Sequence, residues 1–173
     1  MLYDKLIFPK RTLTVILLSM LSMGFLSVTA ARKKPVQKIK VACIGNSITY
    51  GTGIQDREHF SYPVQLQKML GDKYLVGNFG KPGATLLNHG HRPYMQQEEY
   101  RQAMAFKGDI AVIHLGINDT DPRNWPNYRD EFVKDYLSLM DSLRSANPKV
   151  RFILACMTPI AHRHPRFISG TKQ

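Results

Sequence analysis

A serine stands directly after a short apolar run, in the segment GNSIT at residues 45–49. The run before it, residues 39–44 (IKVACI), has the composition of a buried β-strand. A parallel strand delivers its last residues to the carboxyl edge of the sheet, where open α/β folds bind their ligands. Ser47 is therefore a candidate nucleophile, although a Gly/Ser turn that caps a helix accounts for the same residues.

Two later loops carry groups that can hold a developing oxyanion. Loop 80–85 (GKPGAT) offers backbone N–H groups that the side-chain-free Gly83 can bring close to a substrate oxygen. Loop 116–119 (GIND) places the side-chain amide of Asn118 after a strongly apolar segment. A tetrahedral acyl intermediate needs such donors, each worth about 3 to 4 kcal/mol in the transition state. With the N–H of Ser47, the loops would supply three donors for acyl chemistry.

The elements that must position these loops alternate along the chain. Strands are predicted at 39–44, 73–79, 109–115 and 150–157, and helices at 62–70, 96–106 and 128–146. The continuous apolar run 109–115 favours a strand covered on both faces. This alternation predicts a parallel sheet in a three-layer α/β fold with right-handed crossovers, in which all three loops lie on one edge.

The ordered blocks GNSIT, GKPGAT and GIND resemble those of the SGNH (GDSL-type) hydrolase family, over residues 38–173. The resemblance implies a flavodoxin-like α/β/α fold with a parallel sheet. It also implies that Ser47 is the nucleophile and that Gly83 and Asn118 complete the oxyanion hole. Asn46 stands where the family usually has an aspartate, a change that we expect to affect loop hydrogen bonding more than reaction type.

The segments GINDTDPRNW and TPIAHRHPRF resemble secreted bacterial carbohydrate acetylesterases, such as sialate O-acetylesterases and xylan acetylesterases. This likeness implies removal of O-acetyl groups from a carbohydrate through a serine acyl-enzyme, with no cofactor. His89, His91, His162 and His164 are candidate substrate contacts. The His-Gly-His segment of His89 and His91 lacks an evident third metal ligand, so no metal site is predicted.

The family's catalytic base and its orienting acid come from an Asp-x-x-His block after the fifth strand. No aspartate follows the fourth predicted strand here, since the last acid is Asp141. We therefore expect an incomplete hydrolase domain at 39–173, without the fifth strand, the last helix and the catalytic histidine. Asp56 and His59 form a similar string in the first loop, but spacing alone does not orient an imidazole toward a serine.

Two alternatives to a whole enzyme follow from the missing block: a non-catalytic glycan-binding remnant and a fragment of a longer esterase. Without a base, a serine hydroxyl is a weak nucleophile. An incomplete sheet would also expose an edge strand and apolar faces. The product of residues 31–173 is therefore expected to be marginally stable or prone to aggregation.

The N-terminus predicts export. Residues 1–30 have a basic start, an apolar stretch at 13–25 and small residues before a predicted cleavage after Ala30, as in a secretory signal peptide. The apolar stretch is shorter than the roughly 20 residues of a membrane span. We expect a secreted or periplasmic protein with no stable membrane anchor after cleavage, and a basic leader at 31–38.

The net charge and its distribution limit the classes of partner that are predicted for this protein. The 173 residues carry a formal net charge of +11 but no basic stripe interleaved with aromatic residues, so a nucleic acid partner is not predicted. A small-molecule or glycan ester, which the charge allows to be acidic, is the expected substrate, and the oligomeric state is left unspecified.

Cys43 and Cys156 fall in predicted inner strands, which favours two buried free thiols, although export would allow a disulfide.

Overall fold

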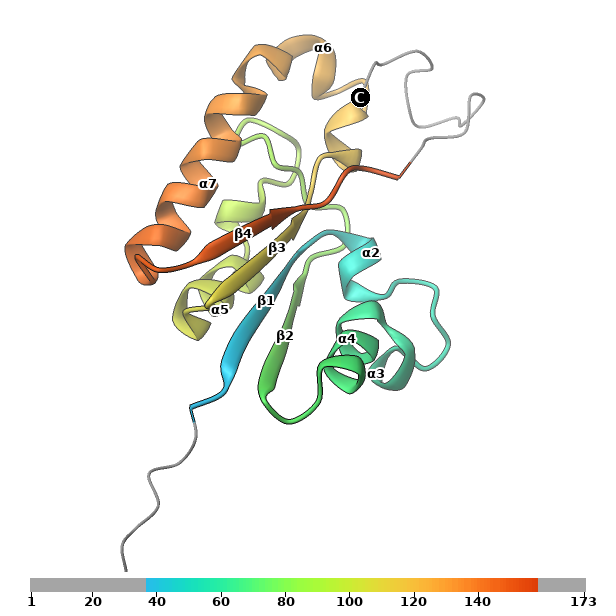
Figure 1. Cartoon of the computed structure of the whole chain (residues 1–173). Helices are drawn as coiled ribbons and strands as arrows, with labels where there is room; N and C mark the ends of the chain where they lie inside the picture. The colour runs from blue at the N-terminus through green and yellow to red at the C-terminus, as the bar shows by residue number, and fades with distance from the viewer. Residues whose placement is uncertain (1–36, 159–173) are drawn as a thin grey trace, which may run out of the picture. The chain divides into compact units, whose positions relative to one another are not determined.

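Figure 1 shows a computed structural model of the chain, which describes residues 37–158. Four parallel strands form one sheet in the order β2-β1-β3-β4. They are β1 (Ile39–Gly45), β2 (Tyr74–Gly80), β3 (Ile110–His114) and β4 (Arg151–Leu154). The predicted parallel α/β sheet is confirmed. The predicted signal peptide, the leader up to residue 36, and both His162 and His164 lie outside the described residues.

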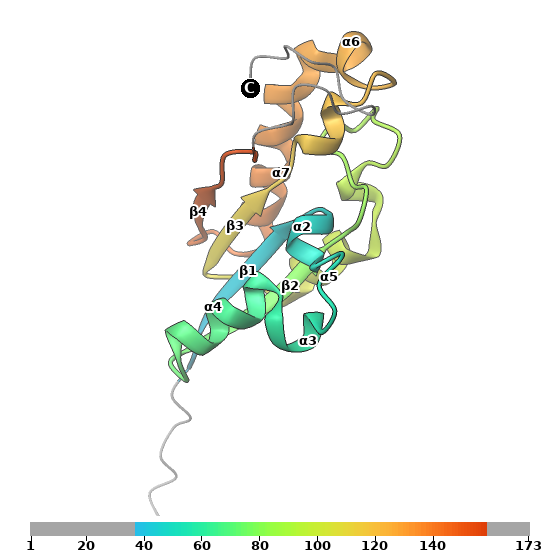
Figure 2. The ribbon, with the colours of Figure 1, turned by 90° about the vertical axis from the view of Figure 1, so that its right-hand side faces the viewer.

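Helices cover both faces of this sheet. Figures 1 and 2 show α4 on one face, and α5 and α7 on the other. The α-helices are α2 (Ser47–Tyr50), α3 (Arg57–Phe60), α4 (Tyr62–Leu70), α5 (Glu98–Phe106), α6 (Trp125–Tyr128) and α7 (Phe132–Ala146). Three 3-10 turns, η1 (Tyr94–Gln96), η2 (Ile117–Thr120) and η3 (Arg129–Glu131), lie in the loops. Within residues 37–158, no helix has the length and apolar character needed to span a membrane.

The predicted helices 96–106 and 128–146 begin later than expected, at Glu98 and Phe132. Short 3-10 turns precede both. Gln97 has an extended backbone (φ −88°, ψ 160°) that separates η1 from α5. Tyr128, the last residue of α6, leaves helical geometry with φ −129° and ψ 7° just before η3 begins. These local backbone breaks confine the regular helices to the segments that pack on the sheet.

The main core lies between the sheet and helices α5 and α7. It includes Ala42 and Ile44 of β1, Ala111 and Ile113 of β3, Ala103 of α5, and Leu139 and Leu143 of α7. The opposite side of β3 is only half-buried, at Ile110, Val112 and His114. The expectation that this strand is covered on both faces is therefore not met in the described structure. The reason is that α4 packs against β2, at the edge of the sheet furthest from β4, and does not extend over β3.

The two cysteines are free and differ in burial. Cys43 lies in β1 and is fully buried, and this burial raises the pKa of its thiol to about 11. Cys156 is exposed, because β4 ends at Leu154 and lies at the margin of the sheet. The prediction of a buried free thiol is confirmed for Cys43 and wrong for Cys156.

Candidate active site

The three predicted blocks follow the carboxyl ends of three neighbouring strands. In the sheet register, Gly45 of β1 lies opposite Gly80 of β2 and His114 of β3. The N–H of Lys81 donates to the carbonyl oxygen of Gly45 at 2.9 Å, which ties the second block to the first. The fold thus brings the three loops to one edge of the sheet, and the serine turn follows β1, the middle one of these three strands.

Ser47 is the first residue of α2, and its own side chain does not cap that helix. The cap is Asn46, whose Oδ1 accepts a hydrogen bond from the N–H of Ile48 at 2.9 Å. Ser47 is half-buried, and its hydroxyl forms no hydrogen bond with any residue in 37–158. The competing interpretation of Ser47 as a helix cap is therefore wrong. An aspartate at position 46 could accept the same hydrogen bond from Ile48, so this cap does not depend on an asparagine.

Gly45 is required by close packing around the serine turn. An added Cβ would overlap Oγ1 of Thr49 and lie 2.8 Å from the carbonyl oxygen of His114. Thr49 is fully buried, so it has little room to move away. The first turn of α2 is consequently held closely against the end of β1, and this fixes the position of Ser47.

Gly83 and Asn118 have geometries suited to the predicted oxyanion hole. Gly83 has a left-handed backbone with φ +77°, which favours glycine, and its N–H meets no acceptor among the described residues. The Nδ2 of Asn118 donates to the carbonyl oxygen of Ala84 at 2.8 Å. Since an amide nitrogen carries two hydrogens, one orients the group and the other is left for a ligand. The catalytic roles of both residues stay predictions.

Asp119 is a residue that the sequence analysis missed. Its carboxylate is fully buried and accepts the N–H of Leu86 at 2.9 Å and that of Leu87 at 2.7 Å. Burial, the largest influence, raises the pKa of Asp119 to about 6, and the two hydrogen bonds oppose this rise. Asp119 therefore locks the loop that contains Gly83 to the loop that contains Asn118. Its position inside the GIND block is the sequence feature that could have indicated this role.

Asn124 was also missed, and it joins His91 to the third block. Its Oδ1 accepts the backbone N–H of His91 at 3.0 Å, which fixes the orientation of the amide. Its Nδ2 then donates to Nδ1 of His91 and to the carbonyl oxygen of Asn118, both at 2.9 Å. The proton of the neutral imidazole consequently sits on Nε2, so His91 presents an N–H donor at its other ring nitrogen.

His89 makes different contacts from His91. Its Nδ1 lies 2.7 Å from Oε2 of Glu131, and its exposed ring lies 5.5 Å from that of Tyr128. In the described part of the chain, no group of three or more His, Cys, Asp or Glu side chains is arranged to hold a metal ion. The proposed role of His89 and His91 in substrate contact stays a prediction.

Asp56 and His59 do pair, with the imidazole Nδ1 at 2.9 and 3.0 Å from the two carboxylate oxygens. Both side chains are exposed. The carbonyl oxygen of His59 accepts hydrogen bonds from the side chains of Gln65 and Lys68. The pair thus belongs to the surface between α3 and α4. Among residues 37–158, no histidine is hydrogen-bonded to Ser47.

The turn that contains Ser47 and the loops that contain Gly83 and Asn118 thus meet at one edge of a parallel α/β sheet. The sequence model of the GDSL-like lipase/acylhydrolase family matches residues 43–171, and the chain belongs to this family.

A curated relative agrees with this membership over part of the chain. An acetylxylan esterase from Xylanibacter ruminicola (strain ATCC 19189 / DSM 19721 / CIP 105475 / JCM 8958 / 23) is 51% identical over 106 residues, which are 61% of this chain and 22% of that protein. The chain thus spans about a fifth of the length of this curated relative.

Solved structures share the fold at low identity. A family two carbohydrate esterase from Clostridium thermocellum, in complex with cellohexaose, is 22% identical with a TM-score of 0.55, covering 74% of this chain and 45% of that one. The SGNH-hydrolase family esterase AlinE4 is 20% identical with a TM-score of 0.50, covering 68% and 58%. At these identities the likeness concerns the fold alone.

Proposed function

We propose that this chain is part of a carbohydrate O-acetylesterase that uses Ser47 as its nucleophile. The observation that carries the proposal is the convergence of three blocks at adjacent strand ends, joined by the bonds of Lys81 to Gly45 and of Asn118 to Ala84. Similarity to an acetylxylan esterase supports an acetyl ester on a sugar as the substrate class.

In the proposed reaction, Oγ of Ser47 attacks the carbonyl carbon of an acetyl ester and gives its proton to a base. The carbonyl oxygen becomes an oxyanion that accepts hydrogen bonds from the N–H groups of Ser47 and Gly83 and from the free N–H of Asn118. Collapse of this intermediate breaks the ester bond, and the sugar oxygen takes up a proton. Water then cleaves the acetyl-enzyme, releases acetate and restores Ser47. The base would be an imidazole, as in the family's Asp-x-x-His block.

The first test measures acetate release from acetylated xylo-oligosaccharides by the full chain. Ser47→Ala should lower the rate about a thousandfold, because the nucleophile is removed. Ser138→Ala is the matched control, since Ser138 is exposed on α7, and it should keep the wild-type rate. Turnover that persists in Ser47→Ala would refute the nucleophile assignment.

A non-catalytic glycan-binding protein is the second candidate. It is favoured by the observation that the described histidines leave the hydroxyl of Ser47 without an imidazole partner. Labelling of Ser47 by a fluorophosphonate probe would contradict this candidate. Sugar binding without labelling and without acetate release would support it over the esterase.

We also propose that the protein is exported, with residues 1–30 acting as a cleaved signal peptide. The support is the sequence pattern of a basic start, an apolar stretch and small residues before Ala31. N-terminal sequencing of the protein recovered from the periplasm or medium of an expressing bacterium should begin at Ala31. Recovery of uncleaved protein in the cytoplasm would contradict export.

A further inference from the structure

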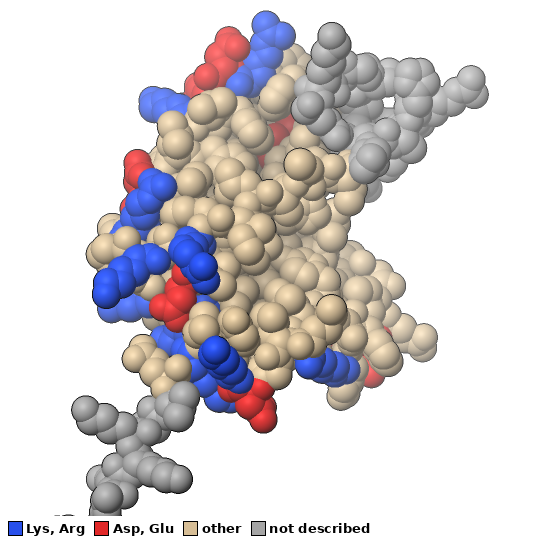
Figure 3. Space-filling model, viewed as in Figure 1, with Lys and Arg blue, Asp and Glu red and all other residues tan. Residues whose placement is uncertain are grey.

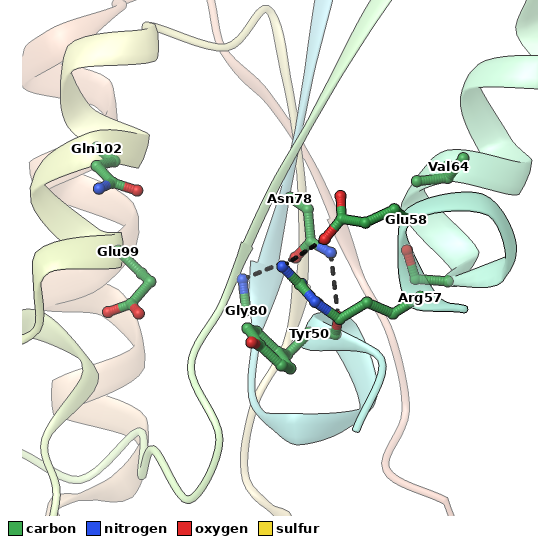
Figure 4. Close-up of a pocket in the computed structure, with 9 residues that line it drawn as sticks. Tyr50, Arg57, Glu58, Val64, Asn78, Gly80, Glu99 and Gln102 are labelled. Atoms are coloured by element: carbon green, nitrogen blue, oxygen red, sulfur yellow. Dashed lines mark hydrogen bonds and ion pairs between the residues drawn. The ribbon is translucent and has the colours of Figure 1, made fainter. Parts of the chain in front are cut away.

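A polar pocket of about 320 Å³ lies beside β2, at a place with no assigned role. Its walls come from five elements: α2, α3, α4, β2 and α5. They include Tyr50, Arg57, Glu58, Val64, Asn78, Glu99 and Gln102. Figure 4 shows the two α5 side chains on one wall and the others across the gap. The volume is within the range of about 300 to 1,000 Å³ of small-molecule sites. Ser47, Gly83 and Asn118 do not line it.

Glu99, which lines this pocket, carries one buried oxygen without a partner. Oε1 of Glu99 accepts a hydrogen bond from Nζ of Lys81 at 3.1 Å. Oε2 of the same carboxylate is buried and has no hydrogen-bond partner among the described residues. A buried polar atom of this kind is uncommon in folded proteins, and a bound group often supplies what it lacks. The carboxylate of Glu99, which lines the pocket, thus has acceptor capacity that the described residues do not use.

The opposite wall is held in place by its own contacts. Asn78 accepts the N–H of Gly80 at 3.0 Å, and its Nδ2 lies 3.4 Å from the carbonyl oxygen of Tyr50. The guanidinium of Arg57 lies 4.0 Å from the centre of the Tyr50 ring and pairs with Glu58 at 2.7 Å. These groups are therefore ordered before any ligand arrives, which lowers the entropic cost of binding.

The charged side chains around the pocket are paired, which favours a neutral ligand over an ionic one. Arg57 is paired with Glu58, and Lys81 with Glu99, so an added anion or cation would meet one unfavourable partner of each pair. The carboxylates accept hydrogen bonds, the guanidinium donates them, and the amides of Asn78 and Gln102 do both. A neutral ligand with several hydroxyl groups, each of which donates and accepts, matches this set.

We propose that this pocket is an accessory binding site for a neutral sugar residue, separate from the serine that cleaves the ester. A hydroxyl of the sugar would donate to the carboxylate of Glu99, and other hydroxyls would bond to the amides of Gln102 and Asn78. The choice of a xylan-type sugar rests on the proposed function, whereas the pocket and its chemistry do not. A site of this kind would hold the glycan while another residue of the same chain is deacetylated.

The test measures binding of unacetylated xylotriose to the full chain by isothermal titration calorimetry. Gln102→Ala and Glu99→Ala should each weaken binding about tenfold, because each removes a hydrogen-bonding partner of the sugar. Gln102 is exposed and makes no side-chain hydrogen bond to described residues, so its replacement should leave folding unchanged. Gln55→Ala, on an exposed loop outside the pocket, is the matched control.

Ser47→Ala separates the two sites, because it should abolish acetate release and leave xylotriose binding unchanged. The proposal is overturned if wild type does not bind xylotriose, or if both pocket variants bind it as wild type does. It is also overturned if binding is lost in Ser47→Ala and kept in Gln102→Ala, which would place the sugar at the serine. Failure of the esterase proposal appears separately, as acetate release that is absent or independent of Ser47.

Discussion

At the scale of single residues, a buried carboxylate decides how the two donor loops meet. Asp119 accepts two backbone N–H groups from Leu86 and Leu87, and it is fully buried. Its side chain does not act on the substrate in the proposed reaction. Asp119 is therefore a positioning residue, and its titration should be visible in stability.

We expect Asp119 to make the free energy of unfolding fall as the pH rises from about 4 to about 6. Its pKa is raised from 3.8 to about 6 in the folded protein, so over this interval the folded state binds more protons than the unfolded state. The stabilising contribution is complete below about pH 4 and lost above about pH 6, and it is at most about 3 kcal/mol. Urea unfolding measured at intervals from pH 4 to 7 gives this slope.

Asp119→Asn should flatten that slope, because an amide does not titrate. Asp121→Asn is the control with the opposite sign. The hydrogen bond from Arg123 lowers the pKa of Asp121 to about 2, so its contribution is lost only as the pH falls from about 4 toward 2. An unchanged slope between pH 4 and 6 in Asp119→Asn would contradict the assigned titration.

At the scale of elements, helix α7 and turn η2 together hold the loop at residues 85–93. Asp135 of α7 is buried and accepts the N–H of Asn88 at 2.7 Å and its Nδ2 at 3.0 Å. Asp119 of the third block and Asn124, the residue before α6, hold the same loop. The loop that carries His89 and His91 is thus fixed by side chains from elsewhere, and not by regular secondary structure.

Asp135→Ala should release this loop and destabilise the fold by about 2 to 3 kcal/mol, because two donors of Asn88 lose a charged acceptor. Hydrogen exchange of the Asn88 amide should become at least tenfold faster, which distinguishes local release from general destabilisation. Asp141→Ala is the matched control on α7. Asp141 pairs with Arg144 at 2.8 Å on the exposed face, and its loss should cost about 0.5 kcal/mol or less. Equal exchange rates in both variants would contradict the role of Asp135.

At the scale of the whole described structure, apolar side chains lie uncovered at the β4 margin of the sheet. Ile153 is 53% exposed and Leu154 is 51% exposed. Figure 3 shows few charged residues over the middle of this face, with lysines and arginines mainly along its α7 side and its lower rim. Among residues 37–158, no strand pairs with the outer edge of β4. Such an edge favours pairing between chains.

We therefore expect the chain to self-associate with rising concentration, and Ile153→Lys to reduce this. A lysine on an edge strand opposes pairing with a second strand, because its charge would have to be desolvated. Sedimentation velocity over a concentration series measures the effect. Val133→Lys adds the same charge at an exposed position of α7 and should leave self-association as in wild type. Equal behaviour of the two variants would show that this edge is not the contact.

Much of the fold follows from local patterns. The apolar runs and their helical spacing place β1, α4, β2 and β3 within about two residues of their observed bounds. The starts of the helices predicted at 96–106 and 128–146 were less predictable, because the backbone at Gln97 and Tyr128 departs from helical geometry. The burial of Cys156 was wrongly predicted for a different reason. β4 ends at Leu154 and lies at the margin of the sheet, where it has a neighbouring strand on one side only.

The sequence by itself determined the alternation of strands and helices, the order of the three blocks and the family. These features depend on residue types a few positions apart, and such patterns are read directly from the chain. Only the tertiary structure decided that Asn46 caps α2 in place of Ser47, that Asp119 and Asp135 are buried, and that a polar pocket opens beside β2. Asp119 and Leu87 are 32 positions apart, and Asp135 and Asn88 are 47 apart. Burial and hydrogen bonding at such separations depend on how the elements pack, which no local pattern specifies.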